Sequence, residues 1–210
     1  MKSRNVDFAG IDAGLLSPQV MYMRTLSTTL VLALSLTACG STQSETPASG
    51  ASTESAAAAA GAPTVGAAAP AIMLQNQAGV VRTLAEHAGH PVVVYFYPRD
   101  ATPGCTTEAC AFRDAWDRLQ ANGTVVYGIS TDDVASHLAF HNEHNLPFDL
   151  LSDPEETAAR AYGVPVRMGF ASRMTFLVDR AGNIARIFPD VDPGVHADEI
   201  LAAVAELPAN

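Results

Sequence analysis

Two cysteines five residues apart, Cys105 and Cys110, are the side chains of this sequence best suited to redox chemistry. They lie in the segment YFYPRDATPGCTTEACAFRD, residues 95–114, where an apolar run ends, a loop follows and a helix is predicted to begin near Gly104. The unpaired amides and the dipole of a helix N-terminus favour an anion, and therefore favour a thiolate at Cys105. Only about 3% of an ordinary thiol is ionised at pH 7. The position of Cys105 therefore predicts a reactive thiol, and a nearby cation would strengthen the effect.

The spacing of the two cysteines restricts how they can react with each other. On one continuous α-helix their Cα atoms would lie about 8.7 Å apart, given a rise of about 7.5 Å and a rotation of about 140°. A disulfide needs about 7 Å or less, so the pair can bridge only if the first helical turns open. The same rotation puts Cys110 on the polar side of the helix, whereas Cys105 shares an apolar face with Ala109, Phe112, Trp116 and Leu119. We expect that face to be buried.

A third cysteine, Cys39, follows an uncharged apolar run at residues 25–38, TLSTTLVLALSLTA. At about 14 residues the run is shorter than the roughly 20 that a transmembrane helix needs, and its length fits the apolar region of a signal peptide. The residues LTAC at its end resemble the lipobox of bacterial lipoproteins, in which the cysteine is lipidated and becomes the mature N-terminus. The alternative is a buried apolar helix with an incidental cysteine.

We therefore expect residues 1–38 to be a signal peptide and Cys39 to carry a lipid. Translation is expected to start at Met21 or Met23, because the short positive head of a signal peptide is found only when counting begins there. This predicts an exported protein, anchored by lipid to a bacterial cell membrane and facing the periplasm or the cell exterior. Residues 39–69 are rich in Ala, Ser, Gly and Thr and should form a flexible tether, because they can bury little apolar surface.

Residues 70–210 are the expected working domain. The run VVVYFY at residues 92–97 predicts a buried central strand. Further strands are predicted at residues 72–75, 80–84, 124–130, 148–151, 174–179 and 183–188, and helices at residues 104–120, 134–144, 154–162 and 195–207. Strands that alternate with helices and end in a β-hairpin and a helix indicate one α/β domain. The order is compatible with a thioredoxin-like fold, a central mixed β-sheet flanked by helices, with an N-terminal β-hairpin.

The segment around the two cysteines resembles a known family. The pattern Pro98-x-x-x-Thr102-x-x-Cys105 matches the active-site signature of peroxiredoxins, and the longer run TPGCTTEACAFRD is similar to the Q subfamily, also called bacterioferritin comigratory protein. The resemblance covers about residues 68–208. It continues in YGIS followed by Asp132, in LPFDLLSD at 146–153, in YGV at 162–164 and in RMTFLVD at 173–179.

The resemblance implies a role for each matching residue. Cys105 corresponds to the peroxidatic cysteine, whose thiolate attacks the O–O bond and becomes a sulfenic acid, and Cys110 to the resolving cysteine. Thr102 corresponds to the hydroxyl that hydrogen-bonds the thiolate and the peroxide. Arg173 corresponds to the guanidinium that stabilises the thiolate and orients peroxide, and Pro98 to the residue that shields the sulfur from water.

The resemblance also implies a function. The protein is expected to be a thiol-dependent peroxidase that reduces hydrogen peroxide and organic hydroperoxides. Its Cys105–Cys110 disulfide would be recycled by a thioredoxin-like dithiol protein. Neither a metal nor an organic cofactor is implied, and the resemblance favours a monomer. A nucleic-acid partner is not expected, because 12 Lys and Arg stand against 22 Asp and Glu, a formal net charge of −10.

Two other classes of function are consistent with the sequence alone. One is a membrane-tethered thiol–disulfide oxidoreductase, although that class normally uses C-x-x-C rather than the C-x-x-x-x-C found here. The other is a non-enzymatic, metal-binding surface lipoprotein, because His137, His141 and His144 have a spacing that could assemble a metal site on a helix. No cysteine or carboxylate pattern accompanies these histidines, so we expect a solvated helix face instead.

Several charged residues allow both a functional and a structural interpretation. Asp132 and Asp133 could form a carboxylate pair, but a turn that caps the next helix is the preferred interpretation. Glu108 falls in the first helical turn, where an anion complements the dipole, although it could also position an arginine. Arg99 and Arg113 could add to the positive field near the thiol or simply lie at the surface.

Overall fold

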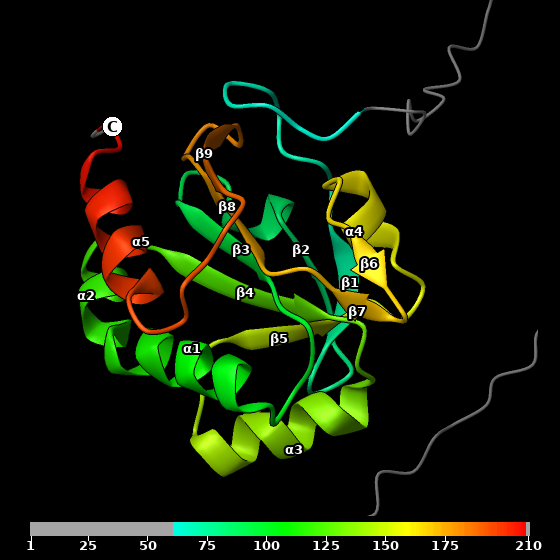
Figure 1. The fold of residues 1–210 in the computed structure, drawn as a ribbon. Coiled ribbons are helices and arrows are strands. Elements are labelled where there is room, and N and C mark those ends of the chain that lie inside the picture. Colours follow the sequence, from blue (N-terminus) through cyan, green and yellow to red (C-terminus); the bar gives the residue numbers. More distant parts are fainter. Residues whose placement is uncertain (1–60, 209–210) are drawn as a thin grey trace, which may run out of the picture. The chain divides into compact units, whose positions relative to one another are not determined.

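The computed structural model describes residues 61–208 of the chain (Figure 1). The expected signal peptide, with Met21, Met23 and Cys39, and most of the expected tether lie outside these residues. Within residues 61–208, no helix is both long enough and apolar enough to cross a membrane.

A seven-stranded mixed sheet forms the centre of the domain (Figure 1). Its strand order is β2-β1-β5-β4-β3-β8-β9, in which β3, β4 and β5 are parallel and the other neighbours antiparallel. The strands are β1 (Met73–Asn76), β2 (Val81–Thr83), β3 (Val92–Phe96), β4 (Val125–Ser130), β5 (Asp149–Ser152), β8 (Met174–Val178) and β9 (Ile184–Phe188). The thioredoxin-like fold class, with its N-terminal hairpin β1–β2, is confirmed.

Helices cover the two faces of the sheet unequally. They are α1 (Pro103–Asp114), α2 (Trp116–Ala121), α3 (Val134–His144), α4 (Thr157–Ala161) and α5 (His196–Ala205), with a short 3-10 helix, η1 (Ala85–His87). Val93 and Tyr95 of β3 pack into a core with residues of α1, α2, α3 and α5. Val94 and Phe96 point to the opposite face, where they share a second core with residues of α4. Alternate side chains of β3 thus point to opposite faces of the sheet, and both faces are buried. This explains why the sequence of β3 is one continuous apolar run.

The predicted helix at residues 104–120 is in fact two helices. The backbone at Ala115 has φ −89° and ψ 0°, which ends α1, and α2 begins at Trp116. Both elements keep their apolar faces in the same core, with Phe112 and Leu119 fully buried. No glycine or proline lies near this break, so the sequence carries no signal for it.

Two further features differ from the sequence-based expectation. Residues 66–69, assigned to the tether, are bound to the sheet. Gly66 N donates to Ile184 O at 2.8 Å, and Ala69 N donates to Gly182 O at 2.9 Å. Backbone groups alone make this pairing, so the small side chains gave no indication of it. A second, two-stranded sheet of β6 (Val166–Arg167) and β7 (Phe170–Ala171) was also not anticipated, because its strands are only two residues long.

Candidate active site

Cys105 lies in the first turn of α1, directly after the loop that leaves β3. Thr102 is the N-cap, with an extended backbone at φ −84° and ψ 147°, and Pro103 is the first helical residue. Proline suits that place because its fixed φ is helical and its missing N–H would have had no partner. Cys105 is a free thiol that is 2% exposed, so the expectation that it is buried is confirmed.

The guanidinium of Arg173 contacts the sulfur of Cys105. Arg173 Nη2 donates to Cys105 Sγ at 3.3 Å, and Arg173 Nη1 donates to Glu108 Oε2. Arg173 immediately precedes β8, and β8 pairs with β3 so that Met174 lies opposite Phe96. This register carries the arginine to the end of β3 at which the cysteine loop begins. The guanidinium of Arg173 therefore contacts both the thiol of Cys105 and the carboxyl group of Glu108.

A glycine permits the close approach of Arg173 to the helix. A Cβ atom built on Gly104 would lie 3.3 Å from Arg173 Nη2, tighter than most such contacts. The strand that carries the arginine is also held from α5, where His196 Nε2 lies 2.9 Å from Thr175 Oγ1. Both His196 and Thr175 are fully buried. The position of Arg173 is thus determined by packing on two sides.

Glu108 is buried beside Arg173. Burial raises the pKa of Glu108 to about 7, an effect that the attraction and hydrogen bond of Arg173 reduce but do not cancel. Its Oε1 has no hydrogen-bond partner among the described residues, in agreement with a carboxyl that is poorly solvated. The pKa of Arg173 is raised, because the lowering by burial is outweighed by Glu108 and Cys105. The preferred interpretation of Glu108 as a partner of the helix dipole was wrong, since its side chain points into the site.

Thr102 and Pro98 lie on the loop that precedes Cys105. The hydroxyl of Thr102 donates to Arg99 O at 3.1 Å, which leaves its oxygen lone pairs free to accept. Pro98 is half-buried at the first turn of the loop, directly after β3 and the buried Tyr97. Pro98 and Thr102 thus bracket a five-residue loop that ends at the cysteine helix.

Cys110 lies on the same uninterrupted helix as Cys105. It is a free, half-buried thiol, whereas Cys105 is buried, so the two sulfurs belong to different faces of α1. The apolar face predicted with Cys105 is present. Ala109, Phe112 and Leu119 are buried, and Trp116 is half-buried against Phe148. The helical spacing argument therefore applies to this structure, and the pair is not poised to form a disulfide while α1 stays intact.

The three histidines of α3 do not form a metal site. No group of three or more potential metal-ligating side chains is found among the described residues. We had expected the three histidines to share a solvated face of the helix. That expectation was wrong, because His137 is 0% exposed. It contacts the carboxylate of Asp100, a residue to which sequence reasoning assigned no role. A buried histidine on the inner face of an amphipathic helix has the same spacing as an exposed one, so only packing distinguishes the two.

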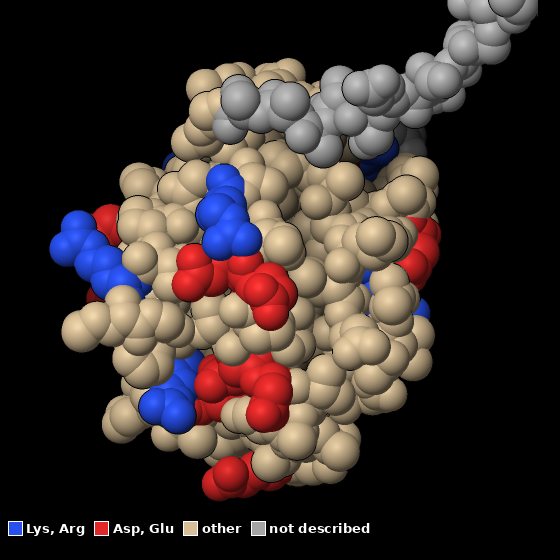
Figure 2. All heavy atoms as spheres, turned by 90° about the vertical axis from the view of Figure 1, so that its right-hand side faces the viewer, with Lys and Arg blue, Asp and Glu red and all other residues tan. Residues whose placement is uncertain are grey.

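The remaining charged residues have structural contacts. Asp133 is the N-cap of α3 and accepts from Ser136 N at 2.8 Å, which confirms the capping interpretation. Arg99 pairs with Asp132 at 3.7 Å, and Arg113 pairs with the neighbouring Asp114 at 2.8 Å. Figure 2 shows the face on the side of α4 and the β6–β7 hairpin, where basic side chains stand apart and adjoin acidic ones. That face of the described chain offers no continuous basic surface.

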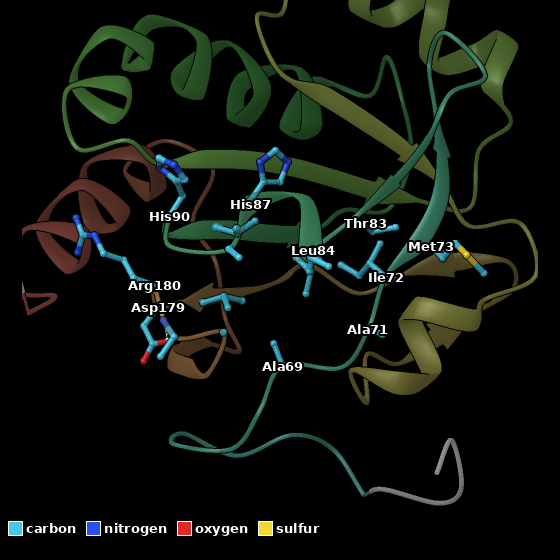
Figure 3. A pocket seen from close by; sticks show the side chains of 16 residues that line it. Ala69, Ala71, Ile72, Met73, Thr83, Leu84, His87, His90, Asp179 and Arg180 are labelled. Atoms are coloured by element: carbon cyan, nitrogen blue, oxygen red, sulfur yellow. Dashed lines mark hydrogen bonds between the residues drawn. The ribbon is translucent and has the colours of Figure 1, made fainter. Parts of the chain in front are cut away.

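Figure 3 shows a cavity of about 530 Å³. Its lining residues Ile72, Val92 and Val178 belong to the second core, whereas Cys105 belongs to the first core, on the other face of the sheet. Ile72, Leu84, Val92 and Val178 belong to its largely apolar lining. Val92 begins β3, whereas Cys105 follows the other end of that strand. Two histidines of the lining are engaged elsewhere. His87 Nε2 lies 2.6 Å from Tyr127 Oη, and His90 Nδ1 lies 3.2 Å from Gly123 O. The lining of this cavity contains no cluster of nucleophilic or unpaired polar side chains. The candidate active site is therefore the one around Cys105.

Comparison with protein families gives an independent view of the whole domain. Residues 65–187, more than half of the chain, match the model of the AhpC/TSA family. A bcp protein of Coxiella burnetii, provisionally named a peroxiredoxin, is 44% identical over 140 residues, which are 63% of this chain and 93% of that protein. The chloroplastic peroxiredoxin Q of Populus jackii is 41% identical over 141 residues, 66% of each chain.

Solved structures extend the likeness to three dimensions. Peroxidoxin BcpB of Mycobacterium tuberculosis matches with a TM-score of 0.66 and 31% identity, over 70% of this chain and 99% of that one. The bacterioferritin comigratory protein of Xanthomonas campestris matches with a TM-score of 0.61 and 35% identity, over 64% of this chain and 90% of that one. The region that matches the AhpC/TSA family model, residues 65–187, includes the loop, the cysteine helix and the strand after Arg173.

Proposed function

This chain belongs to the AhpC/TSA family and is a thiol-dependent peroxidase of the peroxiredoxin type, and on that premise we propose that Cys105 is its peroxidatic cysteine and Cys110 its resolving cysteine. The observation that carries the proposal is the contact of 3.3 Å between Arg173 Nη2 and the buried Sγ of Cys105. The sulfur also lies in the first turn of a helix, where the dipole favours an anion. Both features stabilise a thiolate, which is the nucleophilic form of the residue.

In the first proposed step the Cys105 thiolate attacks one oxygen of the peroxide. An S–O bond forms, the O–O bond breaks, and the departing oxygen leaves with the electron pair and takes up a proton to give water or an alcohol. Sulfur is oxidised to the sulfenic acid and the peroxide is reduced. The planar, permanently charged fork of Arg173 suits the negative charge that develops on the departing oxygen. The hydroxyl oxygen of Thr102, whose proton is donated to Arg99 O, accepts a hydrogen bond from the bound peroxide, and Pro98 limits the access of water.

In the second proposed step the thiolate of Cys110 attacks the sulfenic sulfur of Cys105. The S–S bond forms, the S–O bond breaks, and the departing hydroxide takes up a proton to give water, which protects Cys105 from further oxidation. Since both residues lie on the intact helix α1, this step requires its first turns to open. A thioredoxin-like dithiol protein then reduces the disulfide by thiol–disulfide exchange and is itself oxidised.

Hydrogen peroxide and organic hydroperoxides are the proposed substrates. Alkyl peroxide reduction is an activity of the bacterioferritin comigratory protein of Xanthomonas campestris, and its 35% identity over 64% of this chain supports the same substrate class here. Among the described residues, Arg173 is the one charged side chain that bonds the buried sulfur. Such a site can admit a neutral peroxide.

Peroxide consumption by the wild type and by Cys105→Ser tests the chemical proposal. With a dithiol donor present, the wild type should consume peroxide and Cys105→Ser should not. Cys110→Ser is the matched control, because it should complete one turnover per molecule and then stop at the sulfenic acid. Equal steady-state rates for the wild type and Cys105→Ser would refute the role of Cys105. Disulfide reduction in insulin without peroxide consumption would favour the rival thiol–disulfide oxidoreductase.

We also propose that the mature protein is a lipid-anchored monomer on the outer side of a bacterial cell membrane. The support is the run of uncharged residues 25–38 followed by Cys39, which has the length and end of a lipoprotein signal peptide. Mass spectrometry of the mature N-terminus tests cleavage and acylation at Cys39 together. A mature protein that begins elsewhere, or an unmodified Cys39, would refute the anchor, and light scattering of the delipidated protein tests the monomer.

A further inference from the structure

The loop between β3 and α1 contains a buried carboxylate, Asp100, that the proposed chemistry does not use. Its side chain is only 4% exposed and is surrounded by three donors. Tyr97 Oη donates to Oδ1 at 2.7 Å, Ser136 Oγ donates to Oδ2 at 2.7 Å, and His137 Nδ1 lies 2.9 Å from Oδ2. Burial acts to raise the pKa of Asp100, but these hydrogen bonds outweigh it and lower the pKa below its ordinary value. The carboxylate is therefore retained as an anion within the fold, held by neighbours on two elements.

His137 makes this contact from α3, and Asp100 is its main polar partner. The residue is 0% exposed, and because a carboxylate only accepts, its Nδ1 must carry the proton of the hydrogen bond. Its Nε2 is buried and has no partner among the described residues. Burial of His137 is unfavourable because it leaves Nε2 without a hydrogen-bond partner. The residue keeps one strong hydrogen bond, to Asp100, which indicates that this bond is the reason for a histidine at this position.

The backbone of the loop is held from the same side as the carboxylate. Asp100 N donates to Asp132 Oδ2 at 2.9 Å. Asp132 lies on the connection between β4 and α3, where it also accepts from Ser130 Oγ at 2.8 Å and its carbonyl accepts from Ser152 Oγ at 2.7 Å. Every one of these anchors lies on β4, β5, α3 or their connections. None of them lies on α1, the helix that carries the two cysteines.

The loop also contains a strained residue next to its anchor. Ala101 has φ +54°, in the left-handed region, which is unfavourable for a residue with a Cβ atom. The conformation persists because both of its neighbours are tied down. Asp100 is held by α3, and the Thr102 hydroxyl donates to Arg99 O at 3.1 Å. The turn at Ala101 directs the chain into α1, and Cys105 follows four residues later.

We propose that Asp100 and His137 are positioning residues of the peroxidatic site, which hold the loop of Pro98 and Thr102 against α3 while α1 opens and closes. The inference rests on the proposed function, in which α1 must open before Cys110 can reach the sulfenic sulfur. Because the loop is anchored to α3 and β4, it keeps its place in both states of α1. A misplacement of about 1 Å at a reacting site can lower a rate by about 10²-fold.

Two substitutions of His137 test the proposal. His137→Phe fills the volume but removes the donor, whereas His137→Asn keeps an N–H near the position of Nδ1. The readout is the second-order rate constant of the reduced protein with hydrogen peroxide, followed by the fluorescence of Trp116, the single tryptophan of the chain. We expect His137→Phe to lower this constant about 10- to 100-fold and His137→Asn to recover it to within about threefold. The later rate of disulfide formation should change by less than about threefold.

Phe140→Leu is the matched control for a loss of stability. Phe140 is also buried on α3, at 2% exposure, but it has no polar side-chain atom with which to bond the loop. We expect it to lower the melting temperature and to leave the rate constant with peroxide unchanged. The proposal is overturned if Phe140→Leu lowers that constant as much as His137→Phe does. It is equally overturned if His137→Phe melts earlier but reacts with peroxide at the wild-type rate.

Amide hydrogen exchange separates this proposal from the peroxidase chemistry. The N–H of Asp100 donates to Asp132, so its exchange rate reports whether the loop is held. We expect it to exchange at least about tenfold faster in His137→Phe and at the wild-type rate in His137→Asn and Phe140→Leu. If wild type and Cys105→Ser consume peroxide equally, the proposed function fails, and the exchange rate still decides the anchoring. Wild-type exchange in His137→Phe overturns it.

Discussion

Replacing Glu108 by glutamine should change the pH dependence of stability in a defined direction. Burial raises the pKa of Glu108 from 4.5 to about 7, and in the unfolded chain the group returns to its ordinary value. Between these two pH values the folded protein binds more protons than the unfolded one, so the free energy of unfolding falls as the pH rises. A shift of about 2.5 units corresponds to about 3 kcal/mol. The wild type should therefore lose most of this stability between about pH 5 and pH 7.5.

The assay is urea unfolding of the wild type and Glu108→Gln at pH 5 and at pH 7.5. Glutamine does not titrate, so the variant lacks this contribution while every other titrating group remains. The quantity compared is the unfolding free energy of the wild type minus that of the variant. We expect this difference to be about 2–3 kcal/mol larger at pH 5 than at pH 7.5.

Two results would refute this reasoning. The first is a difference in unfolding free energy that does not change with pH, or that favours the wild type at the higher pH. The second is a direct carbon-13 NMR titration of the Glu108 carboxyl with a midpoint near pH 4.5. Either result would mean that the ion pair with Arg173 outweighs the burial of the carboxylate.

Three further outcomes follow from other contacts. Gly128→Ala should lower the free energy of unfolding in urea by about 1–3 kcal/mol, because the new Cβ would lie 2.6 Å from Tyr95 Oη. Gly61→Ala is the control and should have no effect, because no atom lies within 4 Å of its new Cβ. Tyr95→Phe in the Gly128→Ala background should recover part of the loss, and no recovery would argue against the clash. Arg173→Lys should lower the rate constant with peroxide, measured by stopped flow, by about 10²-fold. The two Nη atoms of the guanidinium bond the Cys105 sulfur and the Glu108 carboxyl at the same time, which a single lysine ammonium does not reproduce. A rate constant within threefold of the wild type would contradict this. Asp133→Ala should remove the α3 cap at a cost of about 1 kcal/mol in thermal unfolding without slowing peroxide consumption, and an unchanged melting temperature would show the cap to be dispensable.

The arrangement around Cys105 distinguishes the helix that is proposed to open from the parts of the fold that hold the site. Cys105 and Cys110 share α1, and the proposed disulfide between them requires that helix to open. Arg173 comes from the start of β8, a strand that lies inside the sheet between β3 and β9. The loop before α1 is bonded to α3 and to the end of β4 through Asp100. The helix that is proposed to open is thus surrounded by groups that are held by other parts of the fold.

Local patterns in the sequence were sufficient to predict most of the elements and part of the site. The run VVVYFY identified the central strand, and Asp133 was correctly expected to cap α3. The cysteine helix was expected to begin near Gly104, one residue from its observed start at Pro103, and the spacing of the two cysteines placed them on different helix faces. Signals of this kind are complete within a few residues, because a cap, a turn or an amphipathic face is built from near neighbours.

Other features could not be derived from such patterns. The break at Ala115 has no breaker residue, and the two-residue strands of the β6–β7 hairpin are too short to show a period. Residues 66–69 join the sheet through backbone groups alone. Where the backbone supplies the contact, the identity of the side chains carries little information about it.

The sequence by itself determined that Cys105 is a thiol at a helix start, and the motif around it indicated which residues to examine. Only the tertiary structure decided what meets that thiol. Arg173 is 68 positions away and reaches the sulfur because β8 pairs with β3 in one register. The burial of Glu108 and His137 likewise depends on what packs over them, since an exposed residue has the same spacing on a helix as a buried one. Contacts between distant segments depend on strand register and packing, which no short stretch of sequence encodes.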